Sequence, residues 1–391
     1  MSSTRPRVYN FGAGPAALPL DVLEKAQREF LNYENTGMSV MEISHRSKTF
    51  EILLNNTKQD LKTLLQVPDN YKILFMQGGG CTQFSAIVYN LLEVKKQQLP
   101  EGEEFNPPLD YFITGSWSAK AADEAKRLYN NVNVVIDVKK SNGNFGSIPP
   151  KEEWKLSGSK AAFVYYCDNE TINGVEFPFI PDIDPSVPLV CDMSSNILSR
   201  KFDVSKFGVI YAGAQKNIGP AGVTIVIVRD DLLVKPKSIN DQDKGVPVTP
   251  TMLNYKIFAD NNSLYNTPPM FSIYISGLVF EWLLNQIGGV GAMEEINKQK
   301  CTKVYDLIDK SKIYRSLVDK PVRSRMNAPF RIVPEKLEKE FLAGAEELKM
   351  VQLKGHRSVG GIRISMYNSV TLEAIDFLIN YMIEFEKKHT N

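Results

Sequence analysis

The sequence is poor in histidine and cysteine, and its charges nearly cancel. Its 391 residues include three histidines and four cysteines, with 46 Lys and Arg against 45 Asp and Glu. A net charge of +1 gives no large basic surface for nucleic acid or an anionic membrane. The cysteines are scattered and include no CxxC pair, so neither a zinc site nor a disulfide framework is predicted. We therefore expect no metal, no nucleic-acid partner and a reducing, cytoplasmic location.

Long apolar runs and the common nucleotide-binding motifs are missing as well. The N-terminal segment MSSTRPRVYN lacks the apolar core typical of a signal peptide. The strongest apolar segment, residues 271–284, is too short and too mixed to span a bilayer. Neither GxGxxG nor GxxxxGK[ST] occurs. No association with a membrane is expected.

What the sequence does contain is an alternation of helical and strand-like segments. Several of the strand-like segments are continuous apolar runs, which is typical of strands covered on both faces. This pattern predicts an α/β fold with a mainly parallel sheet of the seven-stranded type. After about residue 268, long helices and short strand-like pieces predict a smaller α+β domain. We expect a large domain over 17–268 and a small one made of 1–16 and 269–391. The predicted strands are 72–77, 110–115, 132–138, 161–169, 188–195, 209–215 and 223–230.

Polar groups follow three of the predicted strands, where ligands bind in open α/β sheets. Gly78–Gly80 leads into a helix and suits a phosphate, although the same turn could hold no ligand. Asp192 ends an apolar strand and could simply cap the next turn. Lys216 ends another and could simply extend to solvent. Together, however, a phosphate loop, a carboxylate and a lysine are what pyridoxal phosphate needs: donors for its phosphate, an anion beside its ring nitrogen and an amine for its aldehyde.

These motifs resemble the class V branch of fold-type I pyridoxal-phosphate enzymes and, more narrowly, the phosphoserine aminotransferases. The likeness covers nearly the whole chain and follows the family's order. It implies the fold of a fold-type I pyridoxal-phosphate-dependent transferase. The matching stretches are NFGAGPAALP, MSVMEISHRS, FMQGGGCTQFSA, GSWSAKAADEA, NETINGVEFP, CDMSSNILSR, YAGAQKNIGPAG, LYNTPPMFSIY and LKGHRSVGGIRISMYN.

The resemblance implies a role for each residue around the cofactor. Lys216 binds the cofactor as a Schiff base and later moves the proton, and Asp192 pairs with the pyridinium nitrogen. Trp117, which alone would read as a core tryptophan, stacks on the ring, and Thr171 bonds at the ring edge. The resemblance gives the phosphate to Gly80, Cys81 and Gln215, and to Asn266 and Thr267 of the neighbouring subunit. Each site then needs a homodimer.

Substrate recognition is implied for one arginine and two His-Arg pairs. Taken alone, such pairs are surface features more often than sites, but the planar fork of arginine fits carboxylate and phosphate. The resemblance gives the α-carboxylate to Arg363. It places the substrate's distal group among His45, Arg46, His356 and Arg357, some of them across the dimer interface.

The implied reaction is the reversible transfer of the amino group from L-glutamate to 3-phosphohydroxypyruvate. Its products are O-phospho-L-serine, on the route to L-serine, and 2-oxoglutarate, and 4-phosphohydroxy-L-threonine is a further substrate to test. Two alternatives stay open. One is a class V aminotransferase for another acidic amino acid. The other is a protein of this fold that binds a phosphorylated metabolite without turnover.

Overall fold

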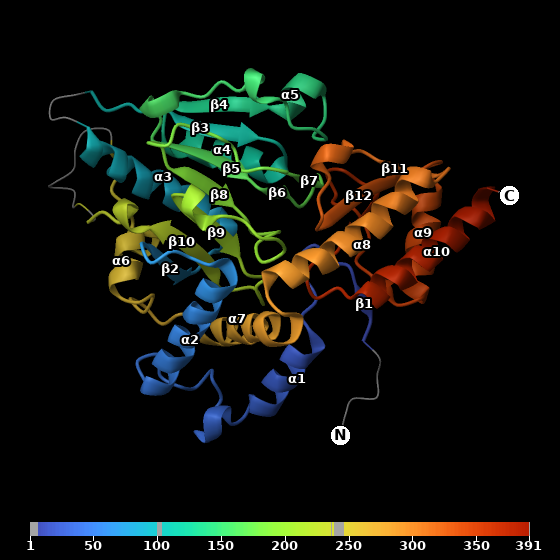
Figure 1. Cartoon of the computed structure of the whole chain (residues 1–391), viewed down its shortest axis with the longest axis horizontal. Helices are drawn as coiled ribbons and strands as arrows, with labels where there is room; N and C mark the ends of the chain where they lie inside the picture. Colours follow the sequence, from blue (N-terminus) through green and yellow to red (C-terminus); the bar gives the residue numbers. More distant parts are fainter. Residues whose placement is uncertain (1–6, 100–103, 236, 238–245, 391) are drawn as a thin grey trace.

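A seven-stranded sheet forms the centre of the molecule. The computed structural model describes residues 7–99, 104–235, 237 and 246–390 (Figure 1). The strand order is β2-β10-β9-β8-β5-β3-β4, and only β10 runs antiparallel to its neighbours. This sheet confirms the predicted mainly parallel α/β fold. Its strands are β2 (Tyr71–Met76), β3 (Leu109–Ile113), β4 (Val132–Asp137), β5 (Phe163–Cys167), β8 (Leu189–Asp192), β9 (Val209–Gly213) and β10 (Thr224–Arg229).

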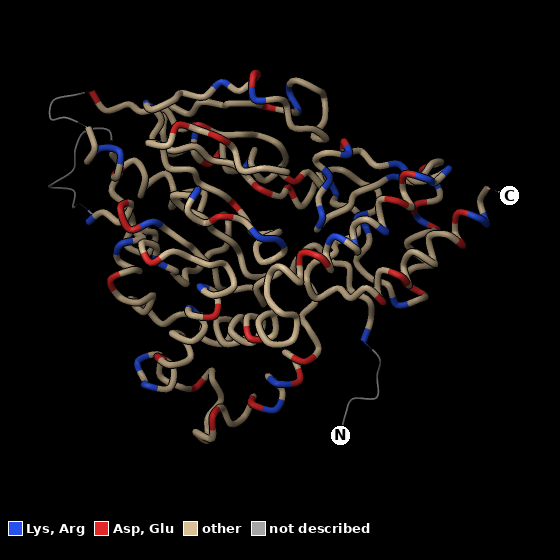
Figure 2. Tube along the Cα trace, viewed as in Figure 1, with Lys and Arg blue, Asp and Glu red and all other residues tan. Residues whose placement is uncertain are grey.

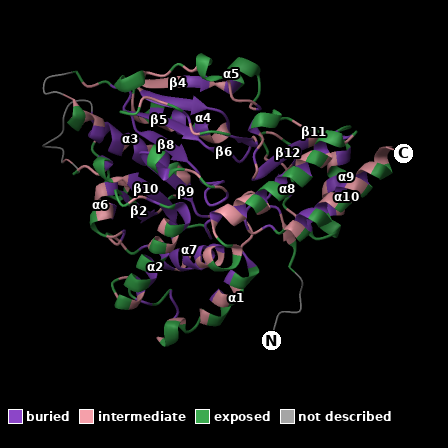
Figure 3. Cartoon of the chain, in the orientation of Figure 1, coloured by how far each residue is buried: buried purple, intermediate pink, exposed green. Residues whose placement is uncertain are grey.

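Helices cover both faces of this sheet. One core lies between the sheet and α1 (Leu20–Glu29), α2 (Lys48–Leu65) and α7 (Met270–Trp282). A second core lies on the opposite face, under α3 (Gly79–Gln98), α4 (Ser116–Leu128) and α6 (Tyr255–Asp260). The strands are mostly buried, whereas the helices expose their outer faces (Figure 3). Lys, Arg, Asp and Glu lie along most of the helices and loops, with some also near the centre of the molecule (Figure 2). Burial on both sides explains why the strands read as continuous apolar runs.

A smaller antiparallel sheet lies beside the large one. Its order is β11-β12-β14, and a parallel pair, β1 with β13, adjoins it. Helices α8, α9 and α10 pack on it around a third core. The bounds are β1 (Tyr9–Asn10), α8 (Val290–Lys310), β11 (Tyr314–Ser316), β12 (Asn327–Ile332), α9 (Leu337–Glu347), β13 (Met350–Val351), β14 (Ile362–Ser365) and α10 (Leu372–Thr390). The remaining short elements are α5 (Val138–Asn142), β6 (Asn169–Glu170) and β7 (Val175–Glu176).

Helix α8 joins the two parts of the molecule. Its first residues, with Met293, belong to the core of the large sheet, whereas Cys301 and the residues after it belong to the third core. Helix α7 packs against α2 and shares the large core. The domain boundary at residue 268 stays a prediction. Judged by side-chain packing alone, the chain passes from the core of the large sheet to the third core within α8.

The apolar segment predicted to be too short for a membrane span lies in a longer helix. Met270–Ile287 covers 18 residues and is long and apolar enough to cross a membrane, judged by length and composition alone. More than half of it, 56%, is buried inside the protein, where it contacts α1 and α2. Burial in the core of the large sheet accounts for its apolar composition.

Candidate active site

The carboxyl ends of five strands meet at one cavity. Strands β2, β3, β5, β8 and β9 all point the same way, so the residues that follow them gather at one edge of the sheet. The cavity there has a volume of about 420 Å³. The residues of the predicted site that line it are Gly80, Cys81, Trp117, Thr171, Asp192, Gln215, Lys216, His356 and Arg363.

Lys216 lies at the floor of this cavity and is 9% exposed. Its Nζ donates to Thr171 Oγ1 at 2.8 Å and lies 6.0 Å from the centre of the Trp117 ring. Burial lowers the pKa of Lys216, and the nearby Asp192 partly opposes that shift. A lysine with a lowered pKa is more often neutral, and the neutral amine is the form that attacks a carbonyl.

Asp192, the last residue of β8, is a buried carboxylate on the same cavity. Its Oδ1 accepts from the backbone N–H of Ser194 at 2.8 Å, and no ion pair with a described residue neutralises it. Burial raises the pKa of Asp192, whereas the Ser194 hydrogen bonds and Lys216 lower it. A carboxylate in this state suits a cationic ligand group such as a protonated ring nitrogen.

The glycine loop after β2 forms another wall. Gly78 has φ +91° and Gly79 has φ +68°, a backbone that side chains rarely adopt, and α3 starts at Gly79. The Thr82 hydroxyl donates to the Gly78 carbonyl at 2.9 Å and so closes the turn. The first turn of a helix carries backbone N–H groups without partners inside the helix, and here it lines the cavity. This loop can therefore hold a phosphate.

Trp117, at the start of α4, is held by a buried acid that the sequence analysis missed. Glu170, at the end of β6, accepts from the backbone N–H of Trp117 and that of Ser118, each at 2.8 Å. It also accepts from the Ser118 hydroxyl at 2.5 Å. A Cβ on Gly115 would lie 2.3 Å from Glu170, so the close approach requires a glycine. The Trp117 Nε1 is buried and has no hydrogen-bond partner.

Arg363, on β14, brings an unpaired positive charge to the cavity. Its Nη1 reaches only the Thr171 carbonyl, at 3.5 Å, and its Nε is buried without a partner. No carboxylate of a described residue pairs with it, and burial lowers its pKa. His356 lies near Arg363, Arg357 and Lys120, and burial together with these cations lowers the pKa of His356. This concentration of positive charge favours a ligand with more than one anionic group.

Five residues of the predicted site do not line the cavity of their own chain. Thr267 Oγ1 lies 3.3 Å from Nδ1 of His45, and Asn266 Nδ2 donates to Gln77 Oε1 at 3.3 Å. Arg46 and Arg357 are exposed. We name His45, Arg46, Asn266 and Thr267 the outer group, because none of them reaches Lys216 within one chain.

Several residues on the cavity were not assigned a role from the sequence. Asn169 donates to Ser195 Oγ at 2.7 Å, and its Oδ1 is buried without a partner. Ser194 accepts from the Gly213 N–H at 3.0 Å. These residues follow β5 and β8 directly, so the strand-end rule that identified Asp192 could have found them. Glu170 directly follows the predicted strand 161–169, so the same rule could have found it. Lys120 lies within α4 and carries no such signal, because only the tertiary fold brings it to the site.

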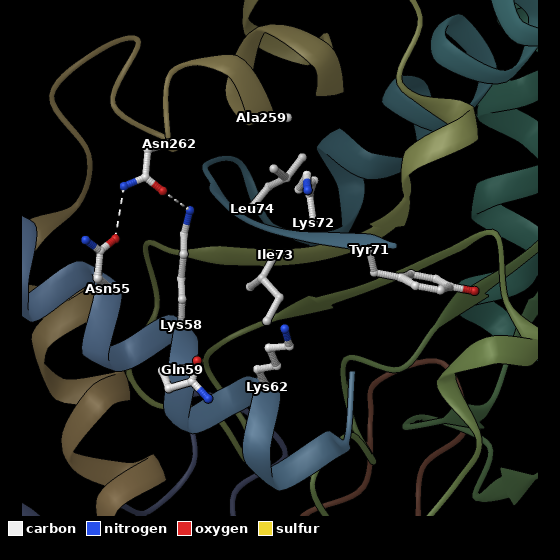
Figure 4. A pocket seen from close by; sticks show the side chains of 10 residues that line it. All are labelled: Asn55, Lys58, Gln59, Lys62, Tyr71, Lys72, Ile73, Leu74, Ala259 and Asn262. Carbon is white, nitrogen blue, oxygen red and sulfur yellow. Dashed lines mark hydrogen bonds between the residues drawn. The ribbon is translucent and has the colours of Figure 1, made fainter. Parts of the chain in front are cut away.

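A second cavity, of about 230 Å³, lies at the edge strand β2, beneath α6 (Figure 4). Lysines 58, 62 and 72 line it. Lys62 pairs with Asp69 at 2.5 Å and Lys72 with Asp230 at 3.4 Å, while Lys58 donates to Asn262. Among the described residues that line this cavity there is no carboxylate and no glycine loop. The cavity at Lys216 is therefore the better candidate for an active site.

Comparisons with known proteins agree with this geometry. The family model "Aminotransferase class-V" matches residues 8–378, and the chain belongs to this family. The phosphoserine aminotransferase of Pseudomonas fluorescens strain SBW25 is 52% identical, over 98% of this chain and 99% of the relative. That of Azotobacter vinelandii is 51% identical over the same shares.

Solved structures give the same result. The phosphoserine aminotransferase of Bacillus circulans subsp. alkalophilus superposes with a TM-score of 0.89 at 46% identity, over 98% of this chain and 99% of that one. A phosphoserine aminotransferase of Trichomonas vaginalis, described as PLP-bound, has a TM-score of 0.86 at 42% identity, over 96% of this chain and 100% of that one. These likenesses confirm the predicted class V family and its fold.

Proposed function

We propose that this chain is a phosphoserine aminotransferase with pyridoxal phosphate as its cofactor. It transfers the amino group of L-glutamate reversibly to 3-phosphohydroxypyruvate. The observation that carries the proposal is one cavity that holds a buried lysine of lowered pKa, an unpaired carboxylate, a glycine loop and an unpaired arginine. The relatives named above support the choice of substrate.

The cavity residues fit the cofactor group by group. We assign the aldehyde to Lys216, the ring nitrogen to Asp192 and the ring face to Trp117. We assign the ring edge to Thr171, and the phosphate to Gly80, Cys81 and Gln215. When bound, the cofactor supplies an electron sink that makes the α-proton of an amino acid acidic. The orphaned Trp117 Nε1 and Asn169 Oδ1 are polar atoms that a ligand in the cavity can satisfy.

The protein's own part in the reaction is to hold the substrate and move one proton. Arg363 binds the α-carboxylate with its planar fork, which orients the Cα–H bond toward Lys216. Lys216 removes that proton as a general base and returns it as an acid, and its lowered pKa favours the neutral form that this needs. Cys167, Phe84 and Ile172 line the cavity and limit water around the amine.

The distal end of the substrate meets the positive groups near His356. A phosphate carries nearly two negative charges at neutral pH, whereas the side chain of glutamate carries one. Because the guanidinium group of arginine stands at the end of a long side chain, it can reach either group. We place Arg357 there together with His45 and Arg46 of a second copy. The phosphate of 4-phosphohydroxy-L-threonine is one carbon farther from Cα, so this substrate tests how far the same groups can reach.

The outer group supports a shared site in a homodimer. His45 and Thr267 lie beside each other but outside their own chain's cavity. Met41, Ile52, Met252 and Tyr265 are exposed large apolar residues from the same segments or close to them in sequence, and burial against a second copy would remove them from water. We propose that each copy contributes its outer group to the other's site. A cytoplasmic location without membrane contact also remains a proposal, and the scattered, unpaired cysteines support it.

The test is the visible spectrum of the enzyme loaded with cofactor. We expect the absorption band of the lysine-bound cofactor to disappear when L-glutamate or O-phospho-L-serine is added, and to return with 3-phosphohydroxypyruvate. Lys216→Ala should lose turnover by orders of magnitude, whereas the exposed Lys206→Ala should behave like the unaltered enzyme. Borohydride trapping followed by peptide mapping should place the adduct on Lys216. An adduct elsewhere removes the proposal, and equal rates with aspartate or alanine remove its substrate.

A further inference from the structure

A buried lysine outside the cavity carries an inference that rests on the function proposed above. Lys300, in the middle of α8, is 0% exposed. Its Nζ donates to three backbone carbonyls, those of Met366 at 3.1 Å, Tyr367 at 2.8 Å and Val370 at 3.0 Å. Among the described residues no carboxylate pairs with it. A fully buried ammonium group without a counter-ion is costly, so its position calls for an explanation.

The three carbonyls belong to one turn. Residues 366–370, which we name the clamp turn, connect β14 with α10. The turn starts directly after the strand that carries Arg363. An ammonium group has three N–H donors, so Lys300 can donate to all three carbonyls at once. The Tyr367 carbonyl also accepts from the backbone N–H of Val370 at 2.9 Å, within the same turn. Lys300 therefore ties the backbone of the clamp turn to the middle of α8.

The clamp turn contacts one residue that lines the cavity and one that is next to Lys216 in the chain. The Tyr367 hydroxyl donates to the Ala13 carbonyl at 2.9 Å, and Ala13 lines the cavity. The backbone N–H of Asn368 donates to Asn217 Oδ1 at 2.9 Å, and Asn217 follows Lys216 in the chain. The turn thus lies between the proposed proton carrier and the proposed carboxylate-binding strand.

A second residue of α8 supports the same turn. Asn297, one helical turn before Lys300, donates to Asn368 Oδ1 at 2.9 Å and to the Ser199 carbonyl at 3.0 Å. Asn368 also donates to the Leu198 carbonyl at 2.9 Å. All three polar residues are at most 5% exposed. Because buried hydrogen bonds in such a network are strong and directional, the turn has little freedom to shift.

We infer that Lys300 is a positioning residue that sets the alignment of Arg363 relative to Lys216 through the clamp turn. It touches neither the substrate nor the cofactor. Its three hydrogen bonds hold the carbonyls of Met366, Tyr367 and Val370. Within the turn that they fix, Tyr367 bonds to Ala13 and Asn368 bonds to Asn217. Burial lowers the pKa of Lys300 to about 7, while the three carbonyl oxygens favour the ammonium form.

The test compares Lys300→Met with Lys303→Met on the same helix. Methionine has a similar length but offers no donor, and Lys303 is exposed and pairs with Asp376 at the surface. For Lys300→Met loaded with cofactor we expect kcat/KM for L-glutamate to fall about 100-fold, with a raised KM, because a small misplacement of a reacting group has effects of this size. The absorption maximum of the bound cofactor should also move. Lys303→Met should leave all three unchanged.

A merely structural role gives a different result. It would lower the melting temperature, but the folded fraction would keep the unaltered KM and spectrum, and that outcome overturns the inference. If Lys300→Met does not fold, Asn297→Ala removes only one support of the turn and should raise KM in the same direction by a smaller factor. An Asn297→Ala enzyme with an unchanged KM and spectrum then counts against it.

Amide hydrogen exchange on the unaltered protein gives an independent measurement. The N–H groups of Met366 and Asn368 should exchange as slowly as those of the central strands. Fast exchange would show a loose turn and sink the inference. Failure of the proposed function looks different, because the unaltered enzyme itself would then show no spectral response to glutamate.

Discussion

At the scale of single residues, Asp192 and Lys216 face one cavity without pairing directly. Asp192 bonds to Ser194 and Lys216 to Thr171. Burial penalises the charged form of each, so the pKa of the aspartate rises and that of the lysine falls. In the protein without cofactor, both side chains therefore have pKa values shifted by burial, as is common for residues of functional sites. A ligand that offers a cation to one and an aldehyde to the other relieves both.

Asp192→Asn tests this reading at one atom. The amide keeps the shape but loses the charge, so turnover should fall by at least about 100-fold, in line with the loss of one aligned electrostatic contact. The melting temperature of the cofactor-free protein should stay equal or rise, because a penalised charge is gone. Enzyme assays and thermal melting measure the two effects, and Asp184→Asn, at a partly exposed site that does not line the cavity, is the control. A variant that keeps nearly full turnover would deny Asp192 its role.

At the scale of elements, α2 forms because its sequence provides a cap and one apolar face. Ser47 accepts from the N–H of Phe50 at 3.3 Å at the start, and Gln66 ends the helix with φ +52°. The buried face packs against α7 and the large sheet. Lys58 on this helix is a charged residue that points into the cavity at β2, where its Nζ donates a hydrogen bond to Asn262 Oδ1 at 2.6 Å (Figure 4).

Lys58 should make stability depend on pH. Burial lowers its pKa from 10.5 to about 8. Between these values the unfolded chain binds more protons than the folded one, so the free energy of unfolding rises as the pH rises from 8 to 10.5. The shift corresponds to about 3 kcal/mol. Lys58→Met should remove this part of the slope.

Urea unfolding at fixed protein concentration and a series of pH values measures the slope. The quantity to compare is the difference between the unaltered protein and Lys58→Met, in which other titrating groups cancel. Lys62→Met is the matched control, since Lys62 is 38% exposed and pairs with Asp69. An identical slope in both variants would mean that Lys58 is solvated.

At the scale of the whole molecule, the proposed shared site needs a second copy of the chain. The outer group belongs to segments just before α2 and α7, whereas Lys216, Asp192 and Trp117 lie at or just after the ends of strands of the large sheet. Both sets lie on one molecule, yet they do not meet. A closed two-fold dimer uses the same surface twice and so completes two sites at once.

Mixing two inactive variants tests the shared site. Lys216→Ala lacks the amine and Arg46→Ala lacks part of the outer group. In a mixed dimer one site has both defects and the other has neither. Random pairing makes about half of the dimers mixed, and one of the two sites in each is intact, so about a quarter of full activity should return. Activity is measured after brief partial unfolding and refolding together. No recovery, with mixed dimers present by mass spectrometry, would place Arg46 in its own chain's site.

Much of the large domain could be predicted from the sequence. The seven strands can be predicted from apolar runs. The position of the site can be predicted from the polar residues at the strand ends, because ligands bind beyond the carboxyl ends of parallel strands. The pair β1 with β13 and the pair β6 with β7 are not predicted, because a two-residue strand shows no periodic pattern and forms only where its partner meets it. Helix α9 is also not among the predicted elements.

The sequence by itself determined the chemistry of the site, because Lys216, Asp192 and the glycine loop are each marked by a local pattern at the end of a strand. Only the tertiary structure decided what supports them. Glu170 under Trp117, the positive groups around His356 and the lysine at the clamp turn come from segments far apart in the chain. A buried polar group is stable only where its partners meet it in space, and sequence spacing does not record that meeting.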